Sequence, residues 1–486
     1  MLIIAILLIP FILSVLSLFI RKEKALGIIN ALGYGLLLGI CGLFTRNFLL
    51  DLHPLSLWGW LYVDSLSAFF MLTTAVVAFA ASVYSIGYIH AEIEENRISL
   101  RKAKGYFHLF NLFCFTMLLV PILNNLALVW IAIEMTTLVS AFLVGFHNVK
   151  ESIEAAWKYI IICSVGITFA LLGIIFFYYT SSTHAGIKSL EWVKMISGAH
   201  FFDPKIVKIA LLFIFVGYGT KAGFAPMHNW LPDAHSQALS PISGLLSGVL
   251  LKISLYAILR FVMLSNFSVG YAFSAKLFVI FGLCSLAIAA GFILVQKDLK
   301  RLLAYHSVEH MGIICVGLGF GATGGAYAAL FHVFNHAITK AFMFFCAGNA
   351  VRIYRTNNMN KMQGMMQVMP FAGVAIFLGA FALGGLPPFS IFISEVLILI
   401  AGFVSKQYFV AASMFLFLAV AFAGLVHHIS KIALGSKPQK MERQKEAFST
   451  KIALLFLGVF ILGLGLKIPQ SFFILLNNCQ KLILGQ

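Results

Sequence analysis

Long apolar runs separated by short polar breaks fill most of this sequence, and they constrain its fold more than any other feature. A helix needs about 20 mainly apolar residues to cross the hydrocarbon core of a bilayer. The pattern therefore predicts an all-α polytopic membrane protein with about 14 transmembrane helices. We expect them near residues 2–20, 26–45, 60–89, 107–123, 125–146, 154–180, 206–240, 242–265, 273–295, 301–319, 325–351, 369–404, 408–431 and 451–468.

The composition agrees with a membrane protein and excludes a soluble enzyme. Of the 486 residues, 61% are hydrophobic and 10% are charged, and no polar stretch is long enough for a separate soluble domain. The first run lacks a charged n-region and an A-x-A cleavage site, which favours a retained span over a signal peptide. The seven cysteines are scattered without a C-x-x-C motif. We therefore expect no metal site, no disulfide framework and no cofactor in this chain.

The basic residues are distributed unevenly between the two sides of the predicted bundle. Of the 34 Lys and Arg residues, 21 fall in loops on one side and 9 on the other. By the positive-inside rule the richer side faces the cytoplasm, so both termini should face away from it. This distribution accounts for the net charge of +17, and we expect no nucleic-acid partner. The other four basic residues lie inside predicted spans: Lys221, Lys252, Arg260 and Lys340.

One predicted span is interrupted within the stretch Thr220–Lys252, TKAGFAPMHNWLPDAHSQALSPISGLLSGVLLK. Gly223 and Pro226 lie in mid-span, and a proline removes a backbone donor and breaks the helix. Freed backbone groups in a membrane need protein or water partners, so the break should lie inside the protein or along a wet cavity. A broken helix with a lysine at each end is typical of an ion path. The alternative is that Lys221 and Lys252 extend to a membrane interface.

A second predicted span is interrupted in the string FALGGLPPFSIFISE. Its paired glycines and prolines precede a glutamate, in the order Gly384, Gly385, Pro387, Pro388 and Glu395. This break stands five predicted helices after the first, and an odd number of crossings gives two such repeats opposite orientations. Two broken helices at matching places in inverted repeats indicate a transport site at the repeat interface.

We therefore expect four parts along the chain. Helices 1–3 occupy residues 1–106, and the first inverted repeat, with helices 4–8, occupies residues 107–265. The second inverted repeat, with helices 9–13, occupies residues 266–435, and a cytoplasmic loop, helix 14 and a tail occupy residues 436–486. Direct residue similarity between the two repeats is weak, so this division rests on hydropathy and on the two breaks.

Several ionisable side chains fall in the middle of predicted spans, where each is costly unless it is paired or hydrated. Glu134 lies mid-helix in LALVWIAIEMTTLVSAF, and Lys221, two helices later, is its expected ion-pair partner. His332, His336 and Lys340 recur at intervals of four residues, which places them on one helical face.

His306 and His310 are also one turn apart, with Glu309 between them. Histidine titrates near neutral pH, so a series of such groups with water between them can relay protons through a membrane. Histidines four residues apart could instead bind haem or copper, but the neighbouring Lys340 argues against a cation. The remaining polar residues are interpreted as structural, with packing roles for His228, His427 and His428 and a helix cap or interhelical contact for Asp64.

Together these motifs resemble the large antiporter-like membrane subunits shared by respiratory complex I, membrane-bound [NiFe] hydrogenases and multisubunit cation/proton antiporters. The 220–252 signature is the most specific, and HAITKAF, LGGLPPFSIFISE and WIAIEMTTL support it. The strings YHSVEHMGI and RTNNMNKMQGM are most similar to the hydrogenase-4 branch of that family.

The resemblance implies a role for each matching residue. Glu134 and Lys221 would form the ion pair of the first half-channel, and Lys252 would lead inward. His310, His336 and Lys340 would form the central relay, with His332 on the same face. Glu395 would end the relay toward the far side.

The leading hypothesis is a proton-translocating subunit of a complex I-like or hydrogenase-4-like assembly in a bacterial or archaeal cell membrane. The sequence has no Rossmann fingerprint, no cluster-binding cysteine set and no nickel site, so peripheral redox subunits and other membrane subunits are the expected partners. One alternative is a subunit of a multisubunit Na⁺/H⁺ antiporter without a redox partner. Another is a subunit of a non-redox energy-coupling complex.

Overall fold

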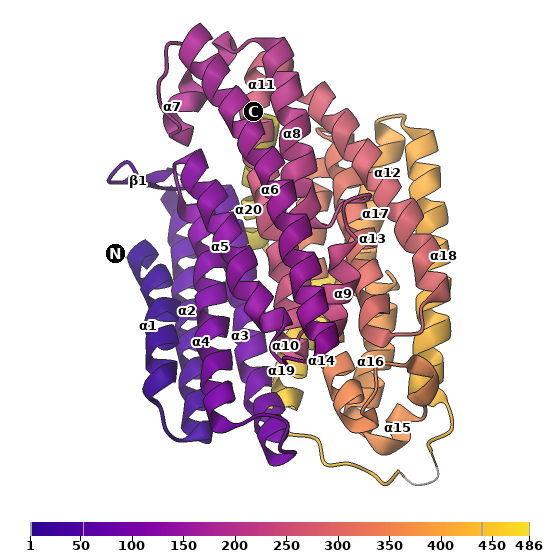
Figure 1. Cartoon of the computed structure of the whole chain (residues 1–486). Helices are drawn as coiled ribbons and strands as arrows, with labels where there is room; N and C mark the ends of the chain where they lie inside the picture. The colour runs from indigo at the N-terminus through magenta and orange to yellow at the C-terminus, as the bar shows by residue number, and fades with distance from the viewer. Residues whose placement is uncertain (1, 52, 439–440, 486) are drawn as a thin grey trace.

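Apolar helices packed side by side form nearly the whole molecule (Figure 1). The computed structural model describes residues 2–51, 53–438 and 441–485, and Lys440, one of the basic loop residues counted above, lies outside them. Within the described residues, 12 helices are long and apolar enough to cross a membrane. The prediction of an all-α polytopic membrane protein is confirmed, while the exact count of fourteen spans stays a prediction.

The first part of the chain forms helices that lie along one edge of the bundle, and a short hairpin joins two of them (Figure 1). The elements are α1 (Leu2–Phe19), α2 (Glu23–Asp51), β1 (Leu55–Leu57), β2 (Leu61–Val63), α3 (Ser65–Glu94), α4 (Leu100–Leu119), η1 (Val120–Ile122), α5 (Leu126–Val144), α6 (Lys150–His184), α7 (Trp192–Ser197) and η2 (Ala199–Phe201). The two strands pair in antiparallel register, with Ser56 opposite Tyr62.

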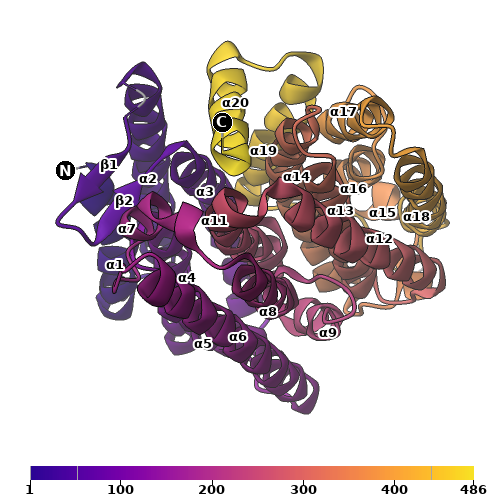
Figure 2. The same cartoon turned by 90° about the horizontal axis from the view of Figure 1, so that it is seen from above.

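The rest of the chain forms the centre and the opposite edge. The elements are α8 (Pro204–Ala222), α9 (Trp230–Gln237), α10 (Ser240–Leu245), the π-helix η3 (Leu246–Leu250), α11 (Leu251–Val269), α12 (Tyr271–Val295), α13 (Leu299–Phe320), α14 (Gly325–Tyr354), η4 (Met359–Lys361), α15 (Met365–Val368), α16 (Pro370–Leu383), α17 (Ser390–Val404), α18 (Tyr408–Leu434), α19 (Phe448–Leu466) and α20 (Gln470–Leu484). Seen from above, α11, α13 and α14 lie between the edge formed by α1 and α2 and the edge formed by α18 (Figure 2).

Burial separates a polar-bearing interior from an apolar outer surface. All of the 18-residue windows that qualify α14 and the segment Ser240–Val269 as spans are buried, whereas 28% of the window in α18 is buried. Large apolar side chains such as Phe409 and Phe415 are exposed on the outer helices. An apolar exterior of this kind is expected where lipid is the solvent, and the interior helices are therefore the ones that can carry polar chemistry.

Short polar side chains determine where several helices begin. The Asn125 side chain accepts hydrogen bonds from the Ala127 and Leu128 backbone N–H groups at the start of α5. Asp298 does the same for the Arg301 N–H of α13, and Asp203 precedes the proline at the first position of α8. These residues satisfy N–H groups that a helix start leaves unpaired.

Both broken helices of the prediction are present. The first break lies between α8 and α9 and contains Gly223 and Pro226. The second lies between α16 and α17 and contains Gly384 and Gly385 with the prolines that follow. The division into two inverted repeats, residues 107–265 and 266–435, remains a prediction that these matching breaks support.

Three details differ from the prediction. Residues 61–63 form a strand, so the helix expected over 60–89 begins only at Ser65. The expected C-terminal tail contains α20, an amphipathic helix whose apolar side packs against α3, α11 and α14. Lys208, expected in an outer loop, is an exposed residue of α8. Weak apolar periodicity over short segments explains all three, since a strand, a short helix and a first helical turn look alike there.

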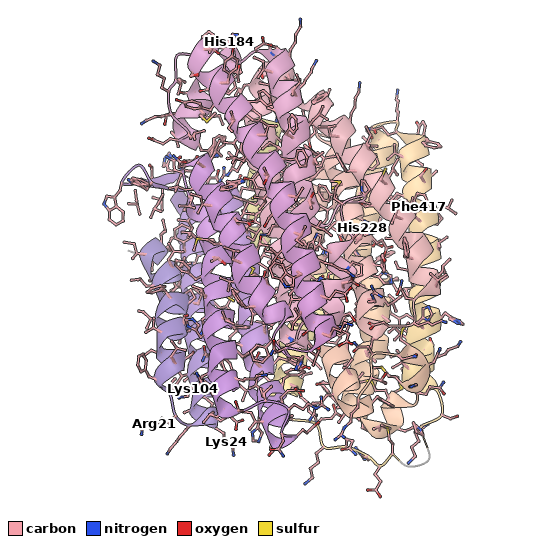
Figure 3. The ribbon with its side chains drawn as sticks, viewed as in Figure 1. Arg21, Lys24, Lys104, His184, His228 and Phe417 are labelled. Atoms are coloured by element: carbon pink, nitrogen blue, oxygen red, sulfur yellow. The ribbon has the colours of Figure 1, made fainter. Side chains whose placement is uncertain are left out.

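The two ends of the bundle differ in charge as the sequence predicts. Arg21, Lys24 and Lys104 lie together at one end, and His184 lies at the other (Figure 3). The chain is thus a multi-pass membrane protein with one strongly basic end.

Candidate functional site

The break between α8 and α9 is fully satisfied by protein groups. Gly223 adopts a left-handed conformation with φ +77°, which ends α8 because residues with a side chain rarely adopt it. The indole N–H of Trp230 donates to the freed carbonyl of Thr220 at 2.9 Å, and the Ala225 N–H donates to the Ser285 hydroxyl at 2.9 Å. The interruption can therefore persist in a membrane interior.

Lys221 lies directly before this break and is fully buried. Its Nζ donates to the Ile133 carbonyl at 2.5 Å and to the Thr137 hydroxyl, both on α5. The Thr137 hydroxyl in turn donates to Glu134 at 3.1 Å. The expected direct ion pair is absent from the described residues, because Thr137 bridges the two charged groups instead.

The Glu134 carboxylate has a second partner on the neighbouring helix. The Ser164 hydroxyl on α6 donates to its Oε1 at 2.7 Å. Glu134 is only partly buried, in contrast to Lys221. Hydroxyl donors stabilise the charged form of a carboxylate in a poorly hydrated place, so two hydroxyls and one nearby ammonium surround this acid.

Lys252 follows the π-helix η3, an element that the sequence did not predict. Its Nζ donates to the Ser247 carbonyl, which the π-turn leaves available. The Ser247 hydroxyl lies 2.7 Å from the Ser307 hydroxyl of α13. Lys252 is thereby joined to the helix that carries His306 and His310.

Three histidine rings stack in the centre of the bundle. The ring of His310 lies 4.6 Å from that of His336 and 5.1 Å from that of His332, measured between centroids. His310 Nδ1 and His332 Nε2 are 2.9 Å apart, and His332 Nδ1 is 2.9 Å from the Ser394 hydroxyl. Both ring nitrogens of His336 are buried without a hydrogen-bond partner among the described residues. The three rings form a continuous polar cluster.

Lys340 lies one helical turn beyond His336 and is fully buried. Its Nζ donates to the Leu303 carbonyl of α13 and lies 5.5 Å from the centre of the Phe344 ring. The charges of Lys340 and Lys252 both act on His336. The histidine cluster is therefore flanked by two lysines.

Glu395 lies on the other side of the histidine cluster, just after the second break. Its ligand atoms and those of His310 and His332 all lie within 4.8 Å of one another. The order of groups is therefore lysine, histidines, glutamate, and His310 and His332 separate Lys340 from Glu395. The carboxylate borders a cavity of about 220 Å³ between α16, α17 and α18.

The backbone of Gly385 makes room for that carboxylate. A Cβ atom at this position would collide with the Glu395 carboxylate oxygen, and the residue has φ +69°. Glycine is the residue that satisfies both conditions. The second break thus positions the terminal acid of the cluster.

Two triads in the central cluster have the spacing of metal ligands, His306–Glu309–His310 and His310–His332–Glu395. Hydrogen bonds within each triad already occupy one or more ligand atoms, and Lys340 lies nearby. A metal needs free nitrogen lone pairs and tolerates a neighbouring ammonium poorly. The geometry favours proton transfer over metal binding.

Some polar groups of the site were not predicted. The hydroxyls of Thr137 and Ser164 have no signal in a single sequence, because serine and threonine in apolar helices usually bond their own backbone. His235 was noted without a role, yet it is fully buried, stacks 4.8 Å from the Phe344 ring, and has no hydrogen-bond partner on either ring nitrogen. Lys300 donates to the Ser236 and Ala238 carbonyls beside it.

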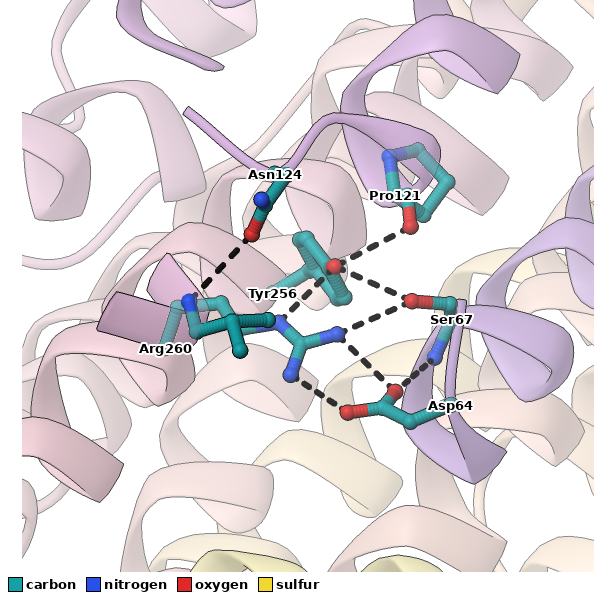
Figure 4. A network of polar contacts seen from close by, with 7 residues as sticks. Asp64, Ser67, Pro121, Asn124, Tyr256 and Arg260 are labelled. Carbon is teal, nitrogen blue, oxygen red and sulfur yellow. Dashed lines mark hydrogen bonds and ion pairs between the residues drawn. The ribbon is translucent and has the colours of Figure 1, made fainter. Parts of the chain in front are cut away.

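Asp64 and Arg260 form a separate buried ion pair near the β-hairpin (Figure 4). Arg260 donates to the two carboxylate oxygens at 2.5 and 2.9 Å, and to Tyr256 and Ser67 at 2.9 Å. Asp64 also accepts from the Ser67 N–H at 2.9 Å as the N-cap of α3. Both roles expected for Asp64, a cap and a contact to another helix, are therefore present. The pair joins α3 to α11.

Two interrupted helices around a row of buried ionisable groups define the chain as an antiporter-like membrane transport subunit. Residues 124–423 match the family described as "NADH:quinone oxidoreductase/Mrp antiporter, TM". Residues 53–97 match "NADH-Ubiquinone oxidoreductase (complex I), chain 5 N-terminus". Since the first match covers more than half of the chain, the protein belongs to this family.

Relatives and solved structures agree with this assignment. The chain is 35% identical over 428 residues to a protein of Methylacidiphilum infernorum named "Hydrogenase-4 component F homolog", covering 87% of this chain and 88% of the relative. A subunit of the membrane-bound sulfane sulfur reductase, an archaeal respiratory membrane complex, has the same fold, with a TM-score of 0.87, 23% identity, and 99% and 97% coverage. A subunit of the Mrp complex from Dietzia sp. has a TM-score of 0.84, 19% identity, and 99% and 97% coverage.

Proposed function

We propose that this chain relays protons between the two sides of a membrane as one subunit of a larger respiratory complex. The relay runs from Glu134 and Lys221 through Lys252 and the histidine cluster to Glu395. The observation that supports it most strongly is the connected series of buried titratable groups beside the two helix breaks. Buried groups of this kind are costly and are rarely retained in a membrane without a role in transport.

Each step of the relay transfers one proton between neighbouring groups. Lys221 and Lys340 are ammonium groups bound to backbone carbonyls, and either can release a proton to a neighbour and regain it. His310 and His332 are 2.9 Å apart, close enough for direct transfer between their ring nitrogens. No hydrogen bond joins Lys221 to Lys252 within the described part of the chain, so we expect water to bridge that interval.

The nature of the complex is inferred from relatives. The named similarity to hydrogenase-4 component F supports an assembly with peripheral redox subunits of hydrogenase type, together with further membrane subunits. In this assembly the redox chemistry belongs to the partners, and this chain contributes the proton path. The expected location is a bacterial or archaeal cell membrane, with the basic end of the bundle in the cytoplasm and both termini on the other side.

Sodium/proton exchange is the second candidate function, and the similarity to the Mrp complex subunit favours it. In that case the same path would carry protons against sodium, without a redox partner. A non-redox energy-coupling complex is the remaining alternative. Subunits that co-purify with the chain distinguish all three.

The experiment is purification of the complex from native membranes, identification of its subunits, and measurement of proton uptake in vesicles. We expect hydrogenase-type redox subunits and proton uptake that depends on their electron donor. Glu134→Gln should assemble normally and impair uptake, because it removes the charge that acts on Lys221. Uptake driven by sodium alone, in a complex without redox subunits, would instead establish the second candidate.

A further inference from the structure

Glu309 is a buried carboxylate that has no place in the relay described above. It lies on α13, one turn after His306, with 3% of its surface exposed. Its Oε2 is 2.6 Å from Nδ1 of His306. A single proton between the two atoms satisfies both groups, whether it rests on the ring or on the carboxyl group. The pair can therefore hold a proton and exchange it internally.

The pair borders the central histidine cluster. The ligand atoms of His306, Glu309 and His310 all lie within 4.8 Å of one another. His310 also belongs to the triad with His332 and Glu395, which has the same spacing. One histidine ring thus separates Glu309 from the terminal acid of the relay.

The charges around Glu309 come from three helices. Lys340 on α14 is the positive charge that faces it, and Glu395 on α17 is the negative one. His306 and His310 on α13 complete its titratable neighbours. Glu309 is also the carboxylate whose charge acts on Lys340. A proton arriving at Glu309 therefore alters the electrostatic environment of the lysine and of the terminal acid together.

The position of Glu309 parallels that of Glu134. Helix α5 is the second helix of the first predicted repeat, and α13 is the second helix of the second. Each begins at an Asx cap, Asn125 or Asp298, and each carries its glutamate about three turns later. Glu134 acts on the buried lysine of its own half, Lys221, as Glu309 acts on Lys340.

We propose that Glu309, paired with His306, is a second proton-holding carboxylate of the relay and controls proton release from Lys340 toward Glu395. The proposal rests on the proposed function and adds to it a residue for the second half of the path. A proton leaving the ammonium of Lys340 is accepted by the pair, which forms neutral Glu309. It then passes to His310 and on through His332 to the carboxylate of Glu395, so one proton is taken up and one is delivered.

The test compares Glu309→Gln and Glu309→Asp in the assembled complex, with Lys221→Ala measured beside them. We expect Glu309→Gln to assemble and to lower proton transfer by at least about tenfold, since an amide cannot take up a proton in this range. Glu309→Asp should restore part of the rate and shift its pH profile, which a purely structural residue would not do. Glu92→Gln is the control, because Glu92 is equally buried but binds Arg97 at the basic end.

Normal transfer by Glu309→Gln, with an unchanged pH profile, would overturn the proposal as long as Lys221→Ala is inactive. If Lys221→Ala also transfers protons normally, the proposed function itself fails. Should Glu309→Gln not assemble, His306→Gln decides, since it keeps the carboxylate and removes its titratable partner. A loss like that expected for Glu309→Gln then supports the proposal, and unchanged transfer overturns it.

Discussion

Glu134 and Lys221 do not touch, because the hydroxyl of Thr137 lies between them. That hydroxyl accepts from the Lys221 ammonium and donates to the Glu134 carboxylate at 3.1 Å. The charge of Glu134 still acts on Lys221. A bridged pair leaves the lysine free to lose its proton more readily than a direct contact would, since direct pairing holds the charged form more firmly.

Replacing Thr137 with valine should interrupt the path at its first step. Valine has nearly the same shape but no hydroxyl, so Lys221 keeps only the Ile133 carbonyl as a partner. We expect proton transfer to fall by about tenfold in vesicles, while assembly of the complex is unchanged. Thr137→Ser is the matched control and should transfer at close to the normal rate. Full activity of Thr137→Val would show that the bridge has no part in transfer.

Removing Lys340 should abolish proton transfer. Lys340→Ala deletes the ammonium that flanks the histidine cluster and acts on His336, and Lys221→Ala should have the same effect in the first half. Lys208→Ala is the control, since Lys208 is exposed on α8, away from the buried groups. Proton uptake by vesicles measures all three. Normal uptake by Lys340→Ala would exclude the proposed order of the relay.

A side chain at Gly385 should displace the terminal acid. Gly385→Ala places a methyl group where the Glu395 carboxylate lies, so the carboxylate must leave the triad with His310 and His332. We expect loss of proton transfer from an assembled complex. Gly186→Ala tests backbone strain separately, because Gly186 has a similar φ of +68° and open space around its Cβ position. Equal losses in the two variants would contradict the steric explanation.

The Asp64–Arg260 pair should contribute to stability rather than to transfer. Asp64→Ala leaves a buried guanidinium without its carboxylate, which should cost about 3–5 kcal/mol of unfolding free energy. Chemical unfolding in detergent measures this value. Glu151→Ala, at an exposed position in the first turn of α6, should cost less than about 1 kcal/mol. A small effect of Asp64→Ala would show that water reaches Arg260.

Both helix breaks were predictable from the sequence. Glycine and proline in mid-span have local backbone consequences that do not depend on distant residues. The face shared by His332, His336 and Lys340 was predictable for a similar reason, since it follows from helical periodicity alone. The short strand at 61–63 and helix α20 were not, because short apolar segments do not distinguish a strand, a helix and a loop.

The sequence by itself determined the membrane class, the basic end of the bundle, the two breaks and the residue types available for a proton path. These properties are set by hydropathy, by charge counts and by the local effects of glycine and proline. Only the tertiary structure decided which groups meet. It placed Thr137 between Glu134 and Lys221, joined Asp64 to Arg260, and put His310 beside Glu395. Contacts between distant helices depend on how the helices pack and rotate against one another, and spacing along a single chain does not encode that.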